Sequence, residues 1–176
     1  MSQNNKSKEP IHISNLDVKF RLEVTSHQEA SALNACFSCG TCTAGCPISE
    51  FFPEYSPKKL AKMVKLGMRQ SVLRNPFIWY CTTCRSCDQH CPQNVKFFNI
   101  LNVLKNMAVK EGYAPSPWVE QTRQIMKTGL VVPQDEHLAE KRADFSLPAL
   151  KNDGIQAKKL LELTGIDKII KAGNER

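Results

Sequence analysis

A run of four cysteines occurs twice in this 176-residue chain, each time with the same spacing and the same following residue. Residues 36–47 and 81–92 both read C-x2-C-x2-C-x3-C-P, and each cysteine of the second run lies 45 positions after its counterpart. The two runs use every cysteine of the chain, namely Cys36, Cys39, Cys42, Cys46, Cys81, Cys84, Cys87 and Cys91. Cysteines at such short intervals restrict the folds that the chain can adopt, because the backbone of each run must wrap closely around the group that its sulfurs bind.

The spacing is that of the bacterial ferredoxin run, which binds [4Fe–4S] clusters. Three cysteines at three-residue steps reach three corners of a cubane. The proline after the fourth cysteine favours an extended backbone, which points that cysteine away. In two-cluster ferredoxins the fourth cysteine of each run binds the other cluster. We therefore expect two [4Fe–4S] clusters with crossed ligands: cluster 1 bound by Cys36, Cys39, Cys42 and Cys91, and cluster 2 bound by Cys81, Cys84, Cys87 and Cys46.

Zinc and disulfide bonds are the alternatives for these cysteines. Zinc sites typically use two separated pairs of ligands, whereas here a third cysteine follows at the same short interval in both runs. Disulfides require an oxidising compartment. Residues 1–10 are polar and contain no apolar signal core. We therefore expect a cytoplasmic protein whose thiols bind metal.

The two cysteine loops differ in their other residues. Gly40 and Gly45 in the first loop allow close approach of the backbone to a cluster. The second loop contains Arg85, whose positive charge favours a reduced cluster, and Asp88, which opposes it. From this sequence we expect Arg85 to make cluster 2 the one with the higher potential. His90 follows a full set of cysteines, so we expect it to be a surface residue.

The net charge of +7 is concentrated in the cysteine-bearing half. Residues 51–110 contain ten basic and two acidic residues, whereas residues 111–176 contain ten of each. A basic patch is one feature of nucleic-acid-binding proteins. Few aromatic residues lie among the lysines, so a platform for stacking bases is poorly supported. We expect no nucleic-acid partner.

The apolar pattern predicts a mainly α protein, because no segment shows a useful alternation with a period of two. Phe97, Leu101, Leu104 and Ala108 form the clearest helical stripe. Ser56-Pro57 and Ser116-Pro117 have the residue types that begin helices, and Gly67, Gly112 and Gly129 have the type that ends them. Residues 131–153 contain two prolines and read as irregular. The predicted helices cover residues 27–35, 57–66, 95–111, 116–128, 155–163 and 166–172, and residues 16–23 predict a short helical turn.

These elements predict three parts: an N-terminal tail at residues 1–27, a helical ferredoxin domain at 28–130 and a C-terminal extension at 131–176 that docks on other subunits. No apolar run approaches the length that spans a bilayer, so we expect no membrane insertion. The chain lacks a dinucleotide-binding fingerprint, a phosphate-binding loop and a nucleophile motif, and it has no spare cysteine. We therefore expect no catalytic residue and no substrate site on this chain.

The residues around the cysteines are specific. The first run reads CFSCGTCTAGCP and is followed by SPKK at 56–59, IWYCTTC at 78–84 opens the second run, MAVKEG spans 107–112, and TGID spans 164–167. With these motifs the chain resembles the C subunits of heterodisulfide reductases. The resemblance implies an α-helical ferredoxin fold with two [4Fe–4S] cluster-binding loops.

The resemblance also implies a complex. In this family a flavin-containing A subunit would supply electrons, and a B subunit with CCG motifs would reduce a disulfide. This chain has no CCG motif and would relay electrons between the two. The iron–sulfur subunits of succinate, glycolate or glycerol-phosphate oxidoreductases have similar cysteine runs and are the alternative family. Their helical domains are usually joined to other domains.

Overall fold

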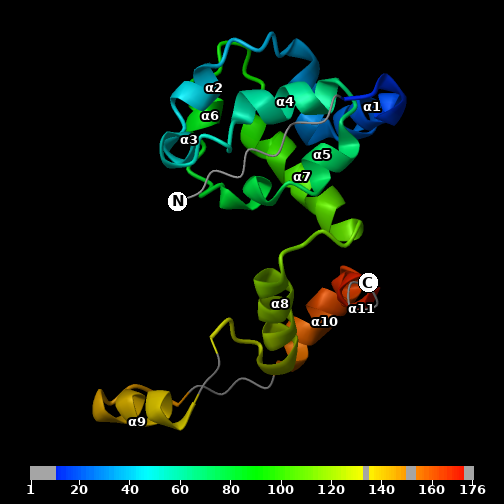
Figure 1. Cartoon of the computed structure of the whole chain (residues 1–176). Coiled ribbons are helices and arrows are strands. Elements are labelled where there is room, and N and C mark those ends of the chain that lie inside the picture. Colours follow the sequence, from blue (N-terminus) through cyan, green and yellow to red (C-terminus); the bar gives the residue numbers. More distant parts are fainter. Residues whose placement is uncertain (1–10, 133–134, 150–153, 173–176) are drawn as a thin grey trace, which may run out of the picture. The chain divides into compact units, whose positions relative to one another are not determined.

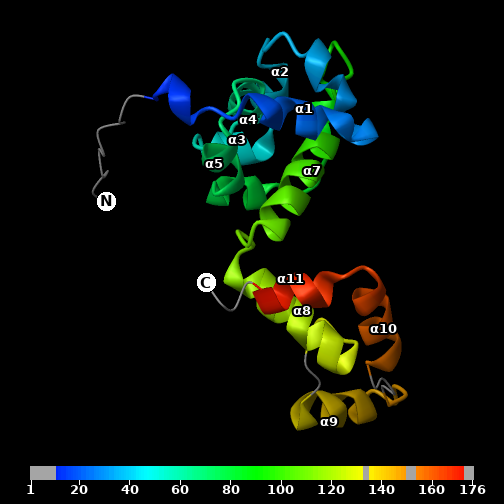
Figure 2. The same cartoon turned by 90° about the vertical axis from the view of Figure 1, so that its right-hand side faces the viewer.

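The computed structural model describes residues 11–132, 135–149 and 154–172, and within these ranges the secondary structure is helical, with no strand. This confirms the predicted mainly α fold. The described chain forms two compact units, Met1–Ala108 and Val109–Arg176, which are considered separately (Figures 1 and 2). No described helix combines the length and the apolar character that crossing a bilayer requires. The part of the predicted tail at residues 1–10 lies outside the described residues.

The first unit contains the cysteine runs between short helices. Their bounds are η1 (Ile13–Asn15), α1 (Val18–Ser26), η2 (Gln28–Ala35), α2 (Thr41–Ala44), α3 (Pro47–Phe51), α4 (Pro57–Lys65), α5 (Arg69–Leu73), η3 (Pro76–Tyr80), α6 (Ser86–Gln89) and α7 (Phe97–Lys110). Helix α7 buries the predicted stripe, and it buries three further positions beside that stripe, Ile100, Val103 and Met107. The buried face of α7 is thus wider than the predicted stripe, and it forms a large part of the core of this unit.

Helix α4 begins as predicted. The Ser56 hydroxyl accepts a hydrogen bond from the Lys59 backbone N–H, and Pro57 occupies the first helical position. Leu60 and Val64 are buried. The helix ends before Gly67, whose φ of +75° suits glycine.

Helix α1 lies within the predicted N-terminal tail but is part of the core. Its Phe20 and Val24 side chains are fully buried. Asp17 caps the helix by accepting from the Lys19 backbone N–H at 3.0 Å, and the Asp17 N–H donates to the Gly67 carbonyl oxygen at 2.8 Å. The packed unit therefore begins before residue 28. The division of the chain into a tail, a ferredoxin domain and a docking extension stays a prediction.

Gly67 is predicted to tolerate no side chain. A Cβ there would lie 2.5 Å from the Asp17 carbonyl oxygen, at a φ that already disfavours other residues. We expect Gly67→Ala to lower the free energy of unfolding by roughly 2–4 kcal/mol, from strain and the clash together. Gly165 is the control, because its φ is +73° and a Cβ there would meet nothing within 4 Å. Denaturation of both variants under anaerobic conditions tests this, and equal losses of stability would contradict it.

The second unit contains α8 (Ser116–Thr128), α9 (Glu136–Asp144), α10 (Ile155–Leu163) and α11 (Ile166–Ala172). Helices α8, α10 and α11 are confirmed. The irregular reading of residues 131–153 was wrong, because α9 forms between the two prolines. Its N-terminus is capped by Asp135, which accepts from the Leu138 backbone N–H at 2.7 Å. Helices α8 and α10 pack together, and Gly154 allows this, since a Cβ there would lie 2.8 Å from the Lys127 carbonyl oxygen.

Candidate metal centres

The two cysteine loops have the same backbone path. Ser38 and its counterpart Thr83 both have a left-handed backbone, with φ of 61° and 62°. Gly40 and its counterpart Arg85 do so as well, with φ of 96° and 62°, and each directly precedes a short helix, α2 or α6. These two helices contact one another (Figure 1). The 45-residue repeat of the sequence is therefore a structural repeat that brings both loops to one place.

One thiol of each loop has a matching hydroxyl partner. Cys39 Sγ lies 3.3 Å from Thr41 Oγ1, and Cys84 Sγ lies 3.4 Å from Ser86 Oγ. These hydrogen bonds lower the pKa of both thiols. A lower pKa favours the thiolate, which is the form that binds metal. Both cysteines are also exposed, so each loop has one sulfur at the protein surface.

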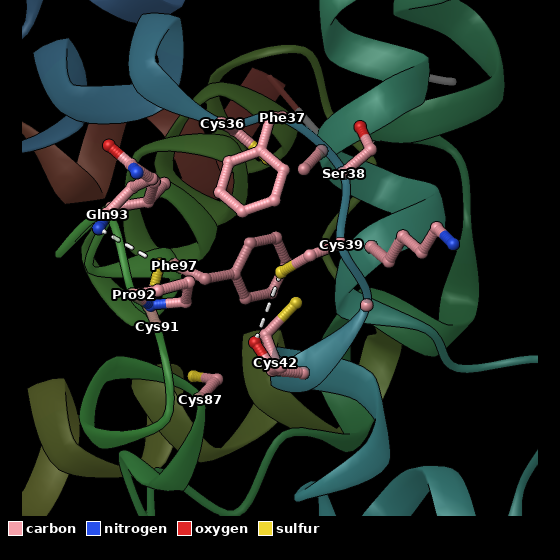
Figure 3. A pocket seen from close by; sticks show the side chains of 15 residues that line it. Cys36, Phe37, Ser38, Cys39, Cys42, Cys87, Cys91, Pro92, Gln93 and Phe97 are labelled. Carbon is pink, nitrogen blue, oxygen red and sulfur yellow. Dashed lines mark hydrogen bonds between the residues drawn. The ribbon is translucent and has the colours of Figure 1, made fainter.

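The first three cysteines line a cavity together with two cysteines of the second run. Figure 3 shows Cys36, Cys39, Cys42 and Cys91 around this cavity, with Cys87 also in its lining. Burial raises the pKa of Cys42, and the nearby thiols of Cys36, Cys39 and Cys91 raise it further. The Val95 backbone N–H donates to Cys91 Sγ at 3.3 Å. The structure thus brings together the four residues predicted for cluster 1.

Three residues predicted for cluster 2, namely Cys46, Cys81 and Cys87, lie near a tyrosine that the sequence did not single out. Tyr55 is only 2% exposed. Burial raises the pKa of its hydroxyl, and so do the neighbouring thiols of Cys81, Cys46 and Cys87, of which Cys81 contributes most. Cys46 therefore lies near the second run, as the crossed assignment requires. Tyr55 has no sequence signal beyond its place before the predicted helix at 57–66.

These residues fit two [4Fe–4S] clusters. All eight thiols are free, and the left-handed positions let each loop curl with backbone N–H groups near sulfur; the Thr83 N–H, for example, lies 3.4 Å from Cys81 Sγ. Within the described residues no three His, Cys, Asp or Glu side chains are arranged to hold a single metal ion. Ligands of a cubane bind separate iron atoms at its corners. Which cysteine binds which cluster stays a prediction.

Gly45 and its counterpart His90 meet between the loops. A Cβ at Gly45 would lie 2.8 Å from His90 Nδ1, so only glycine leaves room for the imidazole ring. The same nitrogen lies 2.8 Å from the Ser86 carbonyl oxygen, which fixes the orientation of the ring. His90 is exposed, as expected. Gly45 therefore makes room for a contact between the two runs.

The structure weakens the argument that Arg85 raises the potential of cluster 2. The Arg85 guanidinium donates to Asn99 at 3.0 Å, stacks over the Phe98 ring at 4.6 Å and lies 3.7 Å from an Asp88 oxygen. The Arg85 side chain is 55% exposed, whereas that of Asp88 is 11% exposed. Asp88 also contacts Cys87 Sγ at 3.7 Å and contributes to raising the pKa of that thiol to about 12, after burial. The Asp88 carboxylate is thus better placed than the Arg85 guanidinium to affect the potential of cluster 2.

Lysine side chains also lie near the thiols. Lys65 Nζ donates to the Cys36 carbonyl oxygen at 2.6 Å, and Lys58 lies against Gly40 and lines the cluster 1 cavity. Lys105 lies 5.7 Å from the centre of the Trp79 ring, and burial lowers the pKa of its amine. Nothing in the sequence pattern shows which loop each of these lysines approaches.

Tyr55 is predicted to tune cluster 2. A hydroxyl close to a ligand sulfur, as that of Tyr55 is to Cys81, stabilises the more negative, reduced state of a cluster. We expect Tyr55→Phe to lower the midpoint potential of cluster 2 by roughly 40 mV, equivalent to about 1 kcal/mol for one electron, and to leave cluster 1 unchanged. Tyr80→Phe is the control, because Tyr80 precedes Cys81 but is exposed. A redox titration followed by electron paramagnetic resonance (EPR) measures both, and a shift as large in the control would contradict the prediction.

The chain is similar to proteins of known type. Residues 32–95 match the family model described as a 4Fe-4S dicluster domain. The chain is 30% identical over 163 residues to the C subunit of the H(2):CoB-CoM heterodisulfide,ferredoxin reductase of Methanothermobacter thermautotrophicus, covering 89% of this chain and 87% of that protein. It is 36% identical over 118 residues to the iron-sulfur subunit designated C 2 of the CoB--CoM heterodisulfide reductase of Methanocaldococcus jannaschii, covering 67% and 62%.

A third relative is the C subunit of the Ferredoxin:CoB-CoM heterodisulfide reductase of Methanosarcina acetivorans, 38% identical over 115 residues, or 65% of this chain and 42% of that protein. The dicluster match spans all eight cysteines, so it identifies what the two loops bind. The chain binds two [4Fe–4S] clusters, and the zinc alternative is excluded.

Proposed function

This chain belongs to the family of heterodisulfide reductase C subunits, and we propose that it relays electrons from a flavin-containing A subunit to a CCG-type B subunit that reduces a disulfide. It is the iron–sulfur, electron-transfer component of an oxidoreductase. The relatives are named as subunits of heterodisulfide reductases or as similar to them, which favours this family over the succinate, glycolate or glycerol-phosphate type.

The observation that carries the proposal is that each cysteine loop has one ligand at the surface. Cys39 and Cys84 are exposed, whereas the other six thiols are partly covered. Helices α2 and α6 hold the two loops against one another. A chain with two adjacent redox sites, each with its own surface edge, is suited to receive an electron at one edge and release it at the other.

The chemistry agrees with a relay role. Reduction of a disulfide to two thiols consumes two electrons and two protons. A bound [4Fe–4S] cluster takes up and gives out electrons one at a time. The eight cysteines are all ligands in our assignment, so none is left to attack a disulfide. We therefore assign bond cleavage and proton uptake to the CCG-type subunit, and no catalytic residue to this chain.

The names of the relatives suggest the substrate. They are called reductases of the CoB–CoM heterodisulfide, and we propose that the complex of this chain reduces a heterodisulfide of that class. We also propose a cytoplasmic location, because eight reduced thiols are best maintained in a reducing compartment.

Affinity isolation of the tagged chain from its native host under anaerobic conditions tests the proposal. We expect a flavoprotein and a CCG-containing subunit to co-purify, and we expect the isolated complex to reduce the CoB–CoM heterodisulfide with a reduced viologen as donor. Mass spectrometry identifies the partners. Isolation of the chain alone, or with a succinate-, glycolate- or glycerol-phosphate-oxidising enzyme, would contradict the proposal.

A further inference from the structure

Helix α4 turns a row of lysines to the surface beside cluster 1. Lys58 and Lys62 are four residues apart and so lie on one face of the helix, with Lys59 next to them. All three side chains are exposed. The opposite face of α4 is buried in the unit through Leu60 and Val64. The lysine face is therefore held outward by the packing of the helix.

This lysine face has no acidic counterpart within the described part of the chain. No ion pair there involves Lys58, Lys59 or Lys62. Helix α4 contains four lysines and no acidic residue in nine positions. Like charges three or four residues apart destabilise a helix slightly. The row thus costs some stability and gains no compensating ion pair among the described residues.

The face is continuous with the exposed edge of cluster 1. Lys58 lies against Gly40 and lines the cavity of cluster 1. Cys39 and Cys42 line the same cavity (Figure 3). Phe37 lines the same cavity and is 60% exposed, although it is a large apolar side chain. An apolar side chain beside a redox edge, with cations on one side, resembles the make-up of a protein interface, with an apolar centre and a charged rim.

We propose that Lys58, Lys59 and Lys62, with Phe37, form the docking surface for an acidic face of the redox protein that exchanges electrons with cluster 1. Complementary charges speed the encounter and fix the orientation of two proteins more than they add affinity. Because Lys58 lies beside the loop of Cys39, this surface would orient the partner so that its own redox group faces the exposed edge of cluster 1. This inference rests on the proposed relay function, and it adds the surface and the charge of the partner.

Zero-length carbodiimide cross-linking of the native anaerobic complex is the first test. The reagent joins a lysine amine directly to a carboxylate in contact with it. We expect cross-links from Lys59 or Lys62 to aspartate or glutamate residues of another subunit. The inference is overturned if other lysines of the chain are cross-linked to partner subunits and Lys59 and Lys62 are not. It is also overturned if Lys59 and Lys62 are cross-linked only to carboxylates of this chain.

Charge reversal is the second test. The Lys59→Glu/Lys62→Glu variant is compared with a Lys19→Glu/Lys127→Glu variant, which changes the net charge equally at exposed helical positions outside α4 and outside the predicted docking extension. We expect the α4 variant to associate with its partner roughly tenfold to a hundredfold more slowly at low salt, with a smaller effect at high salt. The control should behave like the wild type. The iron content of each variant shows whether both clusters are retained.

The outcomes separate this inference from the proposed function. If no flavoprotein or CCG-type subunit co-purifies with the wild type, the relay proposal fails. If the complex forms and turns over but both variants associate equally well, only the docking surface is wrong. Binding of a short oligonucleotide that the α4 reversal abolishes, with partner association unchanged, would assign the face to nucleic acid and overturn the inference.

Discussion

Replacing Cys46 by serine is expected to remove cluster 2 and to spare cluster 1, although Cys46 belongs to the first run. The iron content should fall from about eight to about four per chain, because a cubane that loses one of four thiolates is no longer held firmly. The remaining EPR signal in the reduced protein should be that of cluster 1. The physical reason is that Cys46, Cys81 and Cys87 are all neighbours of the buried Tyr55 hydroxyl.

Cys91→Ser is the matched control, because Cys91 is the counterpart of Cys46 in the repeat. It should remove cluster 1 and leave cluster 2, with the opposite change in the EPR spectrum. Tyr55→Phe provides the means to tell the clusters apart, since it should shift only the cluster that survives in Cys91→Ser. If Cys46→Ser leaves a cluster whose potential still responds to Tyr55→Phe, the crossed ligand assignment is wrong.

Asp88→Asn is expected to raise the midpoint potential of cluster 2 by on the order of 50 to 100 mV. The Asp88 side chain is 11% exposed and lies 3.7 Å from Cys87 Sγ, so solvent screens its charge poorly. A carboxylate at this position opposes an added electron, and its removal relieves that repulsion. Asparagine can still accept the hydrogen bond that the Phe98 backbone N–H donates at 3.0 Å. The local fold should therefore persist.

Glu50→Gln serves as the control for this second prediction. Glu50 follows Cys46 on α3 but is exposed, so its charge is screened by water. Its replacement should shift the potential of cluster 2 by much less than that of Asp88. Arg85→Ala should lower the potential, because it leaves Asp88 without its nearest cation. Redox titrations of the three variants measure these shifts, and a fall in potential in Asp88→Asn would contradict the electrostatic account.

The sequence predicted the helices that have clear local signals. Helix α4 has a serine cap, a proline at its first position and a glycine after it, and its bounds were found to within one residue. Helix α9 was missed because its apolar residues are few and its cap, Asp135, lies in a stretch interrupted by prolines. Helix α1 was predicted only as a short turn, because its burial depends on residues such as Gly67 that are distant in sequence.

In the candidate site too, the features with a local sequence signal were predicted, and those that depend on residues distant in sequence were not. Cysteine spacing predicted the cluster type, and the structure brings Cys91 to the cavity of the first run. Spacing carries no information on side chains from other parts of the chain. Tyr55 and Lys58 approach the loops through the fold alone. Asp88 contacts Cys87 Sγ, whereas the Arg85 side chain is turned to solvent and to Asn99. Such neighbours set the potentials, so the sequence gives poor grounds for ranking the clusters.

Rapid-freeze EPR of the native complex during turnover tests the relay most directly. The complex is mixed anaerobically with its electron donor and a disulfide acceptor, and samples are frozen at intervals shorter than one turnover. The account predicts that both clusters of this chain become reduced and are reoxidised at rates no slower than disulfide reduction. A complex that reduces the disulfide while either cluster remains in one oxidation state throughout would contradict it.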